Sequence, residues 1–160
     1  MRTTEMENLN IRRANTNDLP KINQVIESAV MNWPMPTRLK RLATPALLYN
    51  ATDLKFLELL VATYKKEIIG VAAWDAGLSQ TLPNGKGGLF HGLYVLPLVQ
   101  RQGVGERLME AVFDDAKCHD VCGLLIKSQN VSRSFFESHK LPSLAANDND
   151  YPWQYWKQLA

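Results

Sequence analysis

The chain has 160 residues, 46% of them hydrophobic and 21% charged, and its 18 basic and 16 acidic side chains leave a formal net charge of +2. This length and composition predict one domain with a proper core over residues 1–160. The balanced charge gives no sign of the strongly basic surface of a nucleic-acid-binding protein or of an address for anionic membranes.

The start of the chain, the length of its apolar segments and its cysteines argue against a secreted protein, a membrane protein and a metal site. The first seven residues, Met1 to Glu7, have no apolar stretch of signal-peptide length, and no segment reaches the roughly 18 apolar residues of a membrane span. A cytoplasmic protein is therefore expected. Cys118 and Cys122 flank His119, but a tetrahedral metal site needs a second matched pair of ligands, so we predict two ordinary thiols and no metal.

The first third of the chain is typical of a strand followed by two helices. Residues 9–14 predict a short strand, and Asn17-Asp18-Leu19-Pro20 supplies caps and an early proline for a helix. That helix has one apolar stripe, formed by Leu19, Ile22, Val25, Ile26, Ala29 and Val30. Residues 32–45 are broken by prolines and lead to a second helix.

The middle of the chain predicts a hairpin and a loop. Residues 57–64 and 68–75 are apolar runs separated by Lys65-Lys66-Glu67, the pattern of two antiparallel strands with a charged tip. Residues 76–88 contain Pro83, Asn84 and several glycines, so a mobile loop is expected there.

The remaining elements follow from apolar patterns. Residues 89–96 predict a strand that Pro97 ends, and from Val104 an apolar face recurs for about three turns of helix. Residues 123–128 predict a buried strand, 131–139 a short helix, and the tail two last strands separated by the polar run 145–150. Alternation along the last strand would place Tyr151, Trp153 and Tyr155 on one face, for core packing or for lining a pocket.

Gln100 to Gly105 is a turn between a strand and a helix, with glycine at 103 and 105. Amide hydrogens without partners, the positive end of the helix and neighbouring Arg101 could together hold a pyrophosphate. The alternative is a tight turn that binds nothing, since most glycine-rich turns have no ligand.

The whole stretch resembles the cofactor-binding motif of the GNAT superfamily of acyl-CoA-dependent N-acyltransferases, written Q/R-x-x-G-x-G/A. Gln100, Gly103 and Gly105 match it, Tyr94-Val95-Leu96-Pro97 matches the usual exit of the preceding strand, and Leu108-Met109 matches the apolar pair that follows. The resemblance implies an α/β fold with a mixed, largely antiparallel twisted sheet of about seven strands and helices on both faces. The implied order is β-α-α-β-β-β-α-β-α-β-β.

The resemblance also implies acetyl-CoA as cofactor. Backbone groups near Leu93 and Val95 would pair with the pantetheine arm, in a gap where the strands at 89–96 and 123–128 splay apart. The pyrophosphate cradle would be formed by Gln100, Arg101, Gln102, Gly103, Val104, Gly105 and Glu106, and Phe135 is a further expected cofactor contact. For the acceptor, Trp33 and Met35 would wall the pocket or else plug the core edge, and Trp153 and Tyr155 are further candidates.

Acyl transfer from a thioester to an amine needs a base and a stabilised oxyanion. His91 is the first candidate base, because an imidazole with an ordinary pKa of about 6.5 suits neutral pH. Asp75, acting through a water, is the second. Each also has a structural reading, as a hydrogen-bonded sheet histidine or a turn former. The backbone amide near Val95 is expected to meet the oxyanion.

The chain departs from the family where many members carry a tyrosine that protonates the leaving thiolate. Phe136 stands at that position, and a phenyl ring cannot donate a proton. The thiolate would then leave unprotonated, which an ordinary thiol pKa near about 8.5 allows, or Ser134 or Tyr94 would donate.

We therefore predict an N-acetyltransferase that moves an acetyl group from acetyl-CoA to a primary amine by direct attack in a ternary complex. The alternative is a non-catalytic acyl-CoA-binding or regulatory domain, and a third reading is an α/β domain whose turn holds another nucleotide. The acceptor is expected to be a small-molecule or peptide amine. No nucleic-acid or membrane partner is predicted, and a homodimer is left open.

Overall fold

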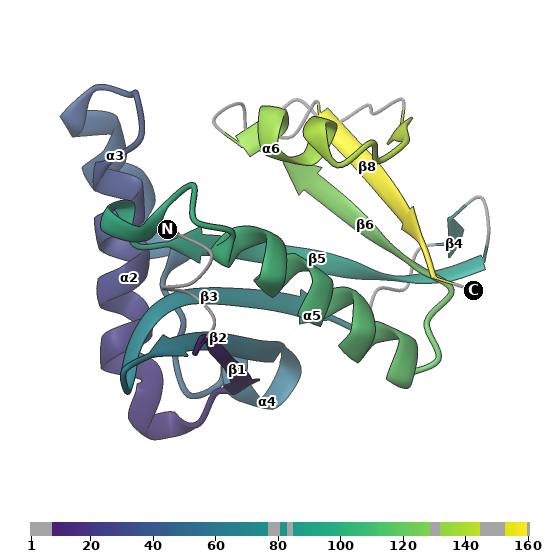
Figure 1. The fold of residues 1–160 in the computed structure, drawn as a ribbon. Coiled ribbons are helices and arrows are strands. Elements are labelled where there is room, and N and C mark those ends of the chain that lie inside the picture. Colours follow the sequence, from purple (N-terminus) through teal and green to yellow (C-terminus); the bar gives the residue numbers. More distant parts are fainter. Residues whose placement is uncertain (1–7, 77–80, 83–84, 129–131, 145–152, 160) are drawn as a thin grey trace. The chain divides into compact units, whose positions relative to one another are not determined.

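The computed structural model describes residues 8–76, 81–82, 85–128, 132–144 and 153–159 (Figure 1). The elements up to the middle of the chain are β1 (Asn10–Arg13), the 3-10 turn η1 (Thr16–Asp18), α2 (Leu19–Met31), α3 (Thr37–Leu47), α4 (Asp53–Phe56), β2 (Glu58–Tyr64) and β3 (Glu67–Asp75). The rest are β4 (Thr81–Leu82), β5 (Gly85–Val95), η2 (Pro97–Val99), α5 (Val104–Cys118), β6 (Gly123–Ser128), α6 (Arg133–Ser138), β7 (Ser143–Leu144) and β8 (Trp153–Gln158).

Backbone contacts divide the chain into two compact units. Unit 1 comprises Met1–Ala73 and Gly92–Val112, and unit 2 comprises Trp74–His91 and Phe113–Ala160. Over the described residues the strands follow the order β1-β2-β3-β5-β6-β8-β7, and β4 pairs with β5. β5 and β6 are parallel, whereas β1–β2, β4–β5, β6–β8 and β7–β8 are antiparallel. The predicted mixed, mostly antiparallel sheet is confirmed.

In unit 1 the predicted hairpin is formed by β2 and β3. These strands are neighbours in the sheet. The two residues between them, Lys65 and Lys66, have positive φ values of 50° and 67°. Two left-handed residues in a two-residue loop give a turn whose twist matches that of the flanking strands. The apolar runs therefore pair over this charged tip, as their spacing predicts.

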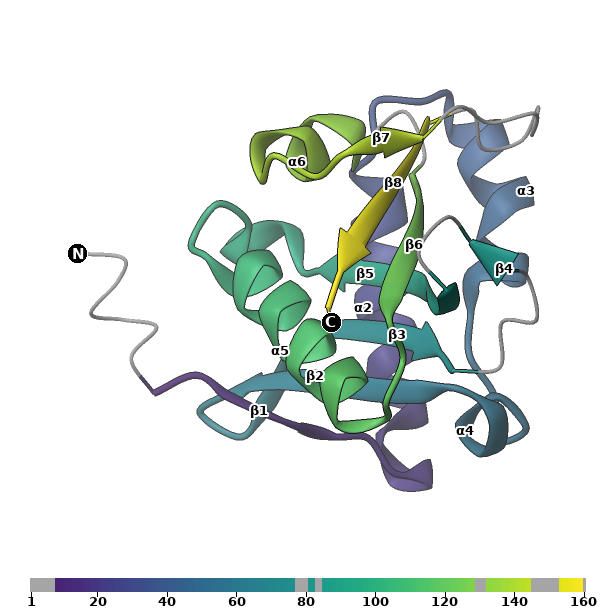
Figure 2. The same cartoon turned by 90° about the vertical axis from the view of Figure 1, so that its right-hand side faces the viewer.

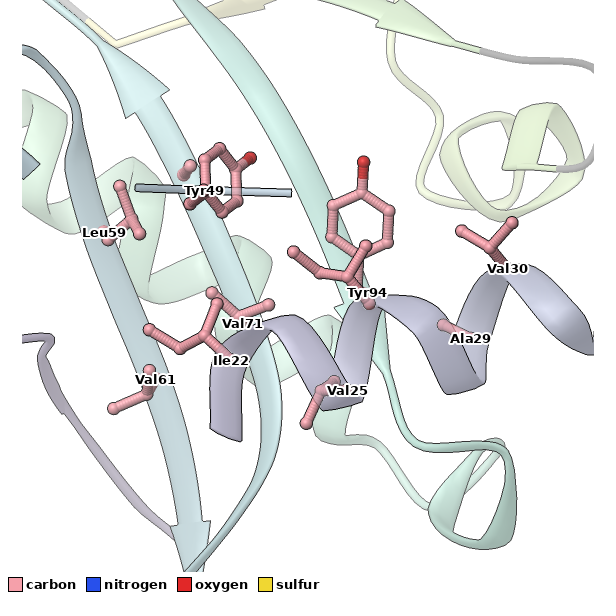
Figure 3. Packing of buried hydrophobic residues seen from close by; sticks show 11 residues of the cluster. Ile22, Val25, Ala29, Val30, Tyr49, Leu59, Val61, Val71 and Tyr94 are labelled. Atoms are coloured by element: carbon pink, nitrogen blue, oxygen red, sulfur yellow. The ribbon is translucent and has the colours of Figure 1, made fainter. Parts of the chain in front are cut away.

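The unit 1 part of the sheet is covered by a helix on each face. Alternation along β3 sends Val71 and Ala73 to one face and Gly70 to the other. Val71 and Ala73 join the apolar cluster under α2 (Figure 3). On the opposite face, a β-carbon built on Gly70 would lie 2.8 Å from Leu108 Cδ1, which belongs to α5. The prediction of helices on both faces is confirmed for this unit.

The turn before α2 is capped by Asn15, two residues before the predicted cap residue Asn17. The Asn15 side chain accepts a hydrogen bond from the amide of Asn17 at 2.9 Å, and the Asp18 carboxylate accepts one from the amide of Asn15 at 2.8 Å. Arg12 donates to both oxygens of Asp18, at 2.8 and 2.9 Å. These bonds, led by those from Arg12, lower the pKa of Asp18.

Two features of the chain differ from the sequence prediction. The one-turn helix α4 was not expected, because four residues are too few to show an apolar period. The loop expected over residues 76–88 is wrong at Thr81–Leu82 and from Gly85 onward, where β4 pairs with the start of β5. At Gly88 the neighbouring backbone leaves no room for a side chain, because a β-carbon would lie 2.9 Å from the carbonyl oxygen of Asp75. The glycines that resemble a loop in sequence therefore allow close strand packing.

Unit 2 contains the parallel pair and the C-terminal strands (Figure 2). The parallel register of β5 with β6 runs from Gly87 opposite Gly123 to Phe90 opposite Ile126. β8 then pairs antiparallel with the whole of β6. The predicted strand 123–128, short helix and two last strands are all present, whereas the polar run 145–150 and Tyr151 lie outside the described residues.

Candidate functional site

The candidate cofactor turn lies in unit 1, between the end of β5 and the start of α5. The Gln100 side chain donates to the carbonyl oxygen of Val95 at 3.3 Å and so ties the turn back to the strand. Arg101 and Gly103 have φ values of 64° and 86°. These left-handed residues reverse the chain direction, and α5 begins at Val104.

The space beside Gly103 is open. A β-carbon built there would meet no atom within 4 Å, so glycine is required by the backbone angle and not by crowding. The first amides of α5 have no partner within the helix, and the helix dipole makes this end positive. Arg101 is exposed beside it. The turn thus combines open volume, amide donors and a cation, which suits an anion.

Gln102 adds a second polar feature to the same turn. Its Oε1 is buried, and among the described residues it has no hydrogen-bond partner. A buried acceptor without a donor is costly in a folded protein. A bound molecule that donates a hydrogen bond at this point would remove that cost.

Two buried phenols lie near the end of β5, one from this strand and one from the segment that follows α3. Leu93 and Val95 are half-buried, and Tyr94 lies in the apolar cluster with Tyr49. Figure 3 shows the two rings close together with their hydroxyls pointing the same way. A β-carbon on Gly92 would lie 2.7 Å from the Tyr49 hydroxyl and 3.5 Å from that of Tyr94. Burial raises the pKa of Tyr49 well above its ordinary value, so this phenol stays protonated.

The two candidate bases lie in unit 2. Asp75 is the last residue of β3 and is half-buried, and His91 on β5 is exposed. Both side chains take part in interactions with other groups of the protein. Their roles in amine deprotonation remain predictions.

Phe136 is part of an aromatic cluster in unit 2. It is 6% exposed, and the centre of its ring lies 6.1 Å from that of Phe90, 5.2 Å from Phe135 and 6.1 Å from Tyr155. These are ordinary distances for packed aromatic rings. The Phe136 ring is therefore held in place by neighbours from β5, α6 and β8.

The acceptor candidates on β8 are both engaged with α6. Tyr155 is 2% exposed and donates a 2.6 Å hydrogen bond to Glu137. The guanidinium of Arg133 lies 4.8 Å from the centre of the Trp153 ring, and Arg133 also pairs with Glu137 at 3.4 Å. Both rings face α6, as alternation predicts, and Tyr155 packs as a core residue.

Of the acceptor candidates before α3, Trp33 packs partly against the apolar cluster of unit 1, and Met35 is half-buried. The carbonyl oxygen of Trp33 accepts hydrogen bonds from the Met35 amide at 2.8 Å and from the Lys40 side chain at 3.2 Å. The residues therefore form a fixed turn.

No group of three or more metal-ligating side chains occurs in the part of the chain that the structure describes. Cys118 and Cys122 are free thiols. Within the same described part, none of the helices is long and apolar enough to cross a membrane.

Comparison with known families gives a match to the acetyltransferase (GNAT) domain over residues 36–139. The chain belongs to the GNAT acetyltransferase family. The match covers the elements from α3 to α6, including the whole cofactor turn. No curated protein sequence matches the chain significantly.

Solved structures show the same GNAT fold. The PaiA N-acetyltransferase of Thermoplasma acidophilum in complex with coenzyme A superposes with a TM-score of 0.74 at 13% identity, over 94% of this chain and 98% of that one. A GNAT acetyltransferase of Brucella melitensis in complex with acetyl-CoA has a TM-score of 0.58 at 20% identity, over 93% and 94%. The N-acetylglutamate synthase of Neisseria gonorrhoeae, in complex with coenzyme A and N-acetyl-glutamate, has a TM-score of 0.69 at 17% identity, over 95% of this chain and 35% of that one.

Sequence reasoning missed one residue close to the end of β5, namely Tyr49. Tyr49 follows α3 in a segment without strand or helix period, so its burial against Gly92 had no local signal. The nearest clue is the capping pair that follows it. Asn50 and Asp53 exchange hydrogen bonds between side chain and amide at 2.8 and 3.0 Å, a pattern that can be read from their spacing.

Proposed function

We propose that this GNAT protein transfers an acetyl group from acetyl-CoA to a primary amine by direct attack in a ternary complex. The observation that carries the proposal is the turn before α5, where Gly103 leaves open volume in front of the first helix amides. Membership of the family and the coenzyme A complexes of structurally similar proteins support the same cofactor.

The residues of the turn fit the cofactor. Amides from Gln100 to Glu106 and the Arg101 side chain would hold the pyrophosphate, because they supply donors and positive charge without a side chain at Gly103. Backbone groups of Leu93 and Val95 would hold the pantetheine arm, and Phe135 is a further contact. The bound cofactor supplies an acetyl group activated as a thioester.

The chain's own residues then have three tasks. His91 or Asp75 takes a proton from the acceptor amine, which must be neutral to attack. The amide of Val95 stabilises the oxyanion by a hydrogen bond. Phe136 offers no proton to the departing thiolate, which would leave unprotonated or take a proton from Ser134 or Tyr94, and the Phe136 ring would serve packing alone. Trp33, Met35 and Trp153 are the candidate acceptor contacts.

A non-catalytic acyl-CoA-binding domain is the second candidate. It is favoured by Phe136, which is buried in the aromatic cluster and stands at the sequence position where the resemblance leads us to expect the proton donor. Both candidates bind the cofactor, so binding alone does not separate them.

Turnover separates the two candidates. We would incubate the protein with acetyl-CoA and a panel of amines, namely polyamines, amino acids, peptide amino termini and lysine peptides, and follow release of the free thiol. Thiol release that depends on an amine and is lost in Gly103→Glu supports the acetyltransferase. Tight acetyl-CoA binding with no turnover on any amine would favour the binding domain. Failure to bind acetyl-CoA would contradict both.

A further inference from the structure

Helix α3 is turned so that a lysine faces inward and leucines face solvent. Its inner face is formed by residues spaced as i, i+3, i+4 and i+7, namely Lys40, Ala43, Thr44 and Leu47. Lys40 is 8% exposed, whereas Leu39 is 48% and Leu42 69% exposed. An amphipathic surface helix normally has the opposite arrangement.

Hydrogen bonds of Lys40 explain this orientation. Its ammonium group donates to the carbonyl oxygen of Met31 at 2.7 Å and to that of Trp33 at 3.2 Å. Met31 is the last residue of α2, where carbonyl groups lack partners within the helix and the dipole is negative. Rotating α3 to bury Leu39 or Leu42 would break both bonds and take from the Met31 carbonyl its lysine donor, while the Trp33 carbonyl would keep only the Met35 amide. The exposure of the two leucines is thus fixed by the fold.

The outer surface of α3, which we call the α3 face, includes the exposed residues Arg38, Leu39, Arg41, Leu42, Pro45 and Ala46. Leu39, Leu42 and Ala46 follow the spacing i, i+3 and i+7 and form an apolar stripe about 10 Å long. Arg38 and Arg41 lie beside it. In the described part of the chain neither arginine forms a salt bridge, and residues 28–52 contain no acidic residue. The face is both apolar and positively charged.

We propose that the α3 face docks an acidic amphipathic helix of a partner protein. Leucines on that helix would pack between Leu39 and Leu42 in the usual ridge-and-groove manner, and its carboxylates would pair with Arg38 and Arg41. The stripe spans about two turns, which is enough to pack against one partner helix. Two arginines beside leucines also lack the aromatic platforms of single-stranded nucleic-acid sites. Docking would be weak and reversible, since the footprint is small.

The test uses a fluorescein-labelled peptide of about 16 residues, with leucines on one helical face and glutamates on the other, and fluorescence anisotropy with the full chain. A second peptide has lysine in place of every glutamate, and vesicles of anionic and neutral phosphatidyl lipids form a third arm. Two protein variants are tested: Leu42→Ser, and a double variant that combines Arg38→Glu with Arg41→Glu. Two matched controls are Phe56→Ser, whose side chain is 73% exposed on α4, and Lys21→Glu, exposed on α2. Circular dichroism verifies that each variant is folded.

We expect the wild-type protein to bind the glutamate peptide saturably. The affinity should fall about tenfold or more in the double arginine variant and several-fold in Leu42→Ser, and it should change within about twofold in both controls. The lysine peptide should bind at least about tenfold more weakly than the glutamate peptide. No binding of the glutamate peptide at about 0.5 mM, or equal binding by the wild type and the folded α3-face variants, would overturn the proposal. Vesicle binding that the same variants abolish, without peptide binding, would assign the face to a lipid surface instead.

Discussion

Tyr155 on β8 donates a hydrogen bond of 2.6 Å from its phenol oxygen to the carboxylate of Glu137 on α6. Burial of the ring, together with this bond, raises the pKa of Tyr155 to about 12. The same bond is the main reason that the pKa of Glu137 is lowered. The phenol of Tyr155, whose ring packs against Phe136, is therefore committed to a structural contact, and it holds α6 against β8.

Replacing Tyr155 by Phe should lower the melting temperature by an amount that depends on pH. Because the pKa of Glu137 is lowered on folding, its share of the stabilisation is present above the ordinary value of 4.5 and lost as pH falls through the folded value. Because the pKa of Tyr155 is raised on folding, the stabilisation that Tyr155 contributes is present below pH 10 and is lost as the pH rises toward 12. Calorimetry across pH should show the largest difference from wild type near neutrality.

Tyr64→Phe is the matched control for this experiment, since Tyr64 lies half-buried on β2 in the other unit. Its effect should not vary with pH over the acidic range. A Tyr155→Phe difference that is the same at pH about 3 and pH about 7 would show that the bond to Glu137 contributes nothing to stability.

Phe136→Tyr should keep or raise turnover in the proposed reaction. The site already accommodates a ring, and the new hydroxyl would supply a donor with an ordinary pKa of about 10. General-acid assistance is worth about 10² to 10⁴ where protonation limits the rate, so thiol-release kinetics can detect it. Phe136→Ala is the packing control and should cost about 3–5 kcal/mol of stability, because the ring is buried among three others. A folded Phe136→Tyr protein that no longer binds coenzyme A would mean that α6 presents this side chain to the cofactor differently from what is proposed.

Substitutions at Gly103 should separate backbone strain from obstruction of the phosphate site. Gly103→Asn should bind coenzyme A with modest loss, since asparagine tolerates the left-handed angle and nothing crowds the position. Gly103→Ala should lose about 1–2 kcal/mol of stability through strain. Gly103→Glu should abolish binding, because its carboxylate would occupy the proposed phosphate position. Thermal unfolding measures the stability of the alanine variant, and calorimetric titration with coenzyme A measures the affinity of the asparagine and glutamate variants. Unchanged affinity in a folded Gly103→Glu protein would refute the assignment.

Alanine at His91 and at Asp75 should identify the base. If one of them deprotonates the amine, its loss should lower kcat about 10²- to 10⁴-fold and flatten the rise of rate with pH. The other single variant should retain the wild-type pH profile. Wild-type rates in both single variants and in the double variant would leave deprotonation to solvent or to another residue.

Local patterns were enough to predict most of this fold. The 3.6-residue period between Leu19 and Val30 identified α2, and the apolar run from Gly123 to Ser128 identified β6 with its bounds. The turn from Gln100 to Gly105 could be predicted as a candidate cofactor site because the resemblance to the family motif rests on residues that are contiguous in the sequence. These features depend on neighbours along the chain.

Other features depended on partners distant in sequence. The β5 strand begins at Gly85 because β4 and β6 pair with it, although its glycines alone suggest a loop. Whether a tyrosine serves packing or chemistry was decided at Tyr155 by Glu137, a residue of another element. The sequence by itself determined most of the helices and strands and the glycine turn before α5, since periodicity and backbone geometry are local. Only the tertiary structure decided that α3 faces inward with Lys40, because the carbonyl groups at the end of α2 that fix its rotation are placed by packing.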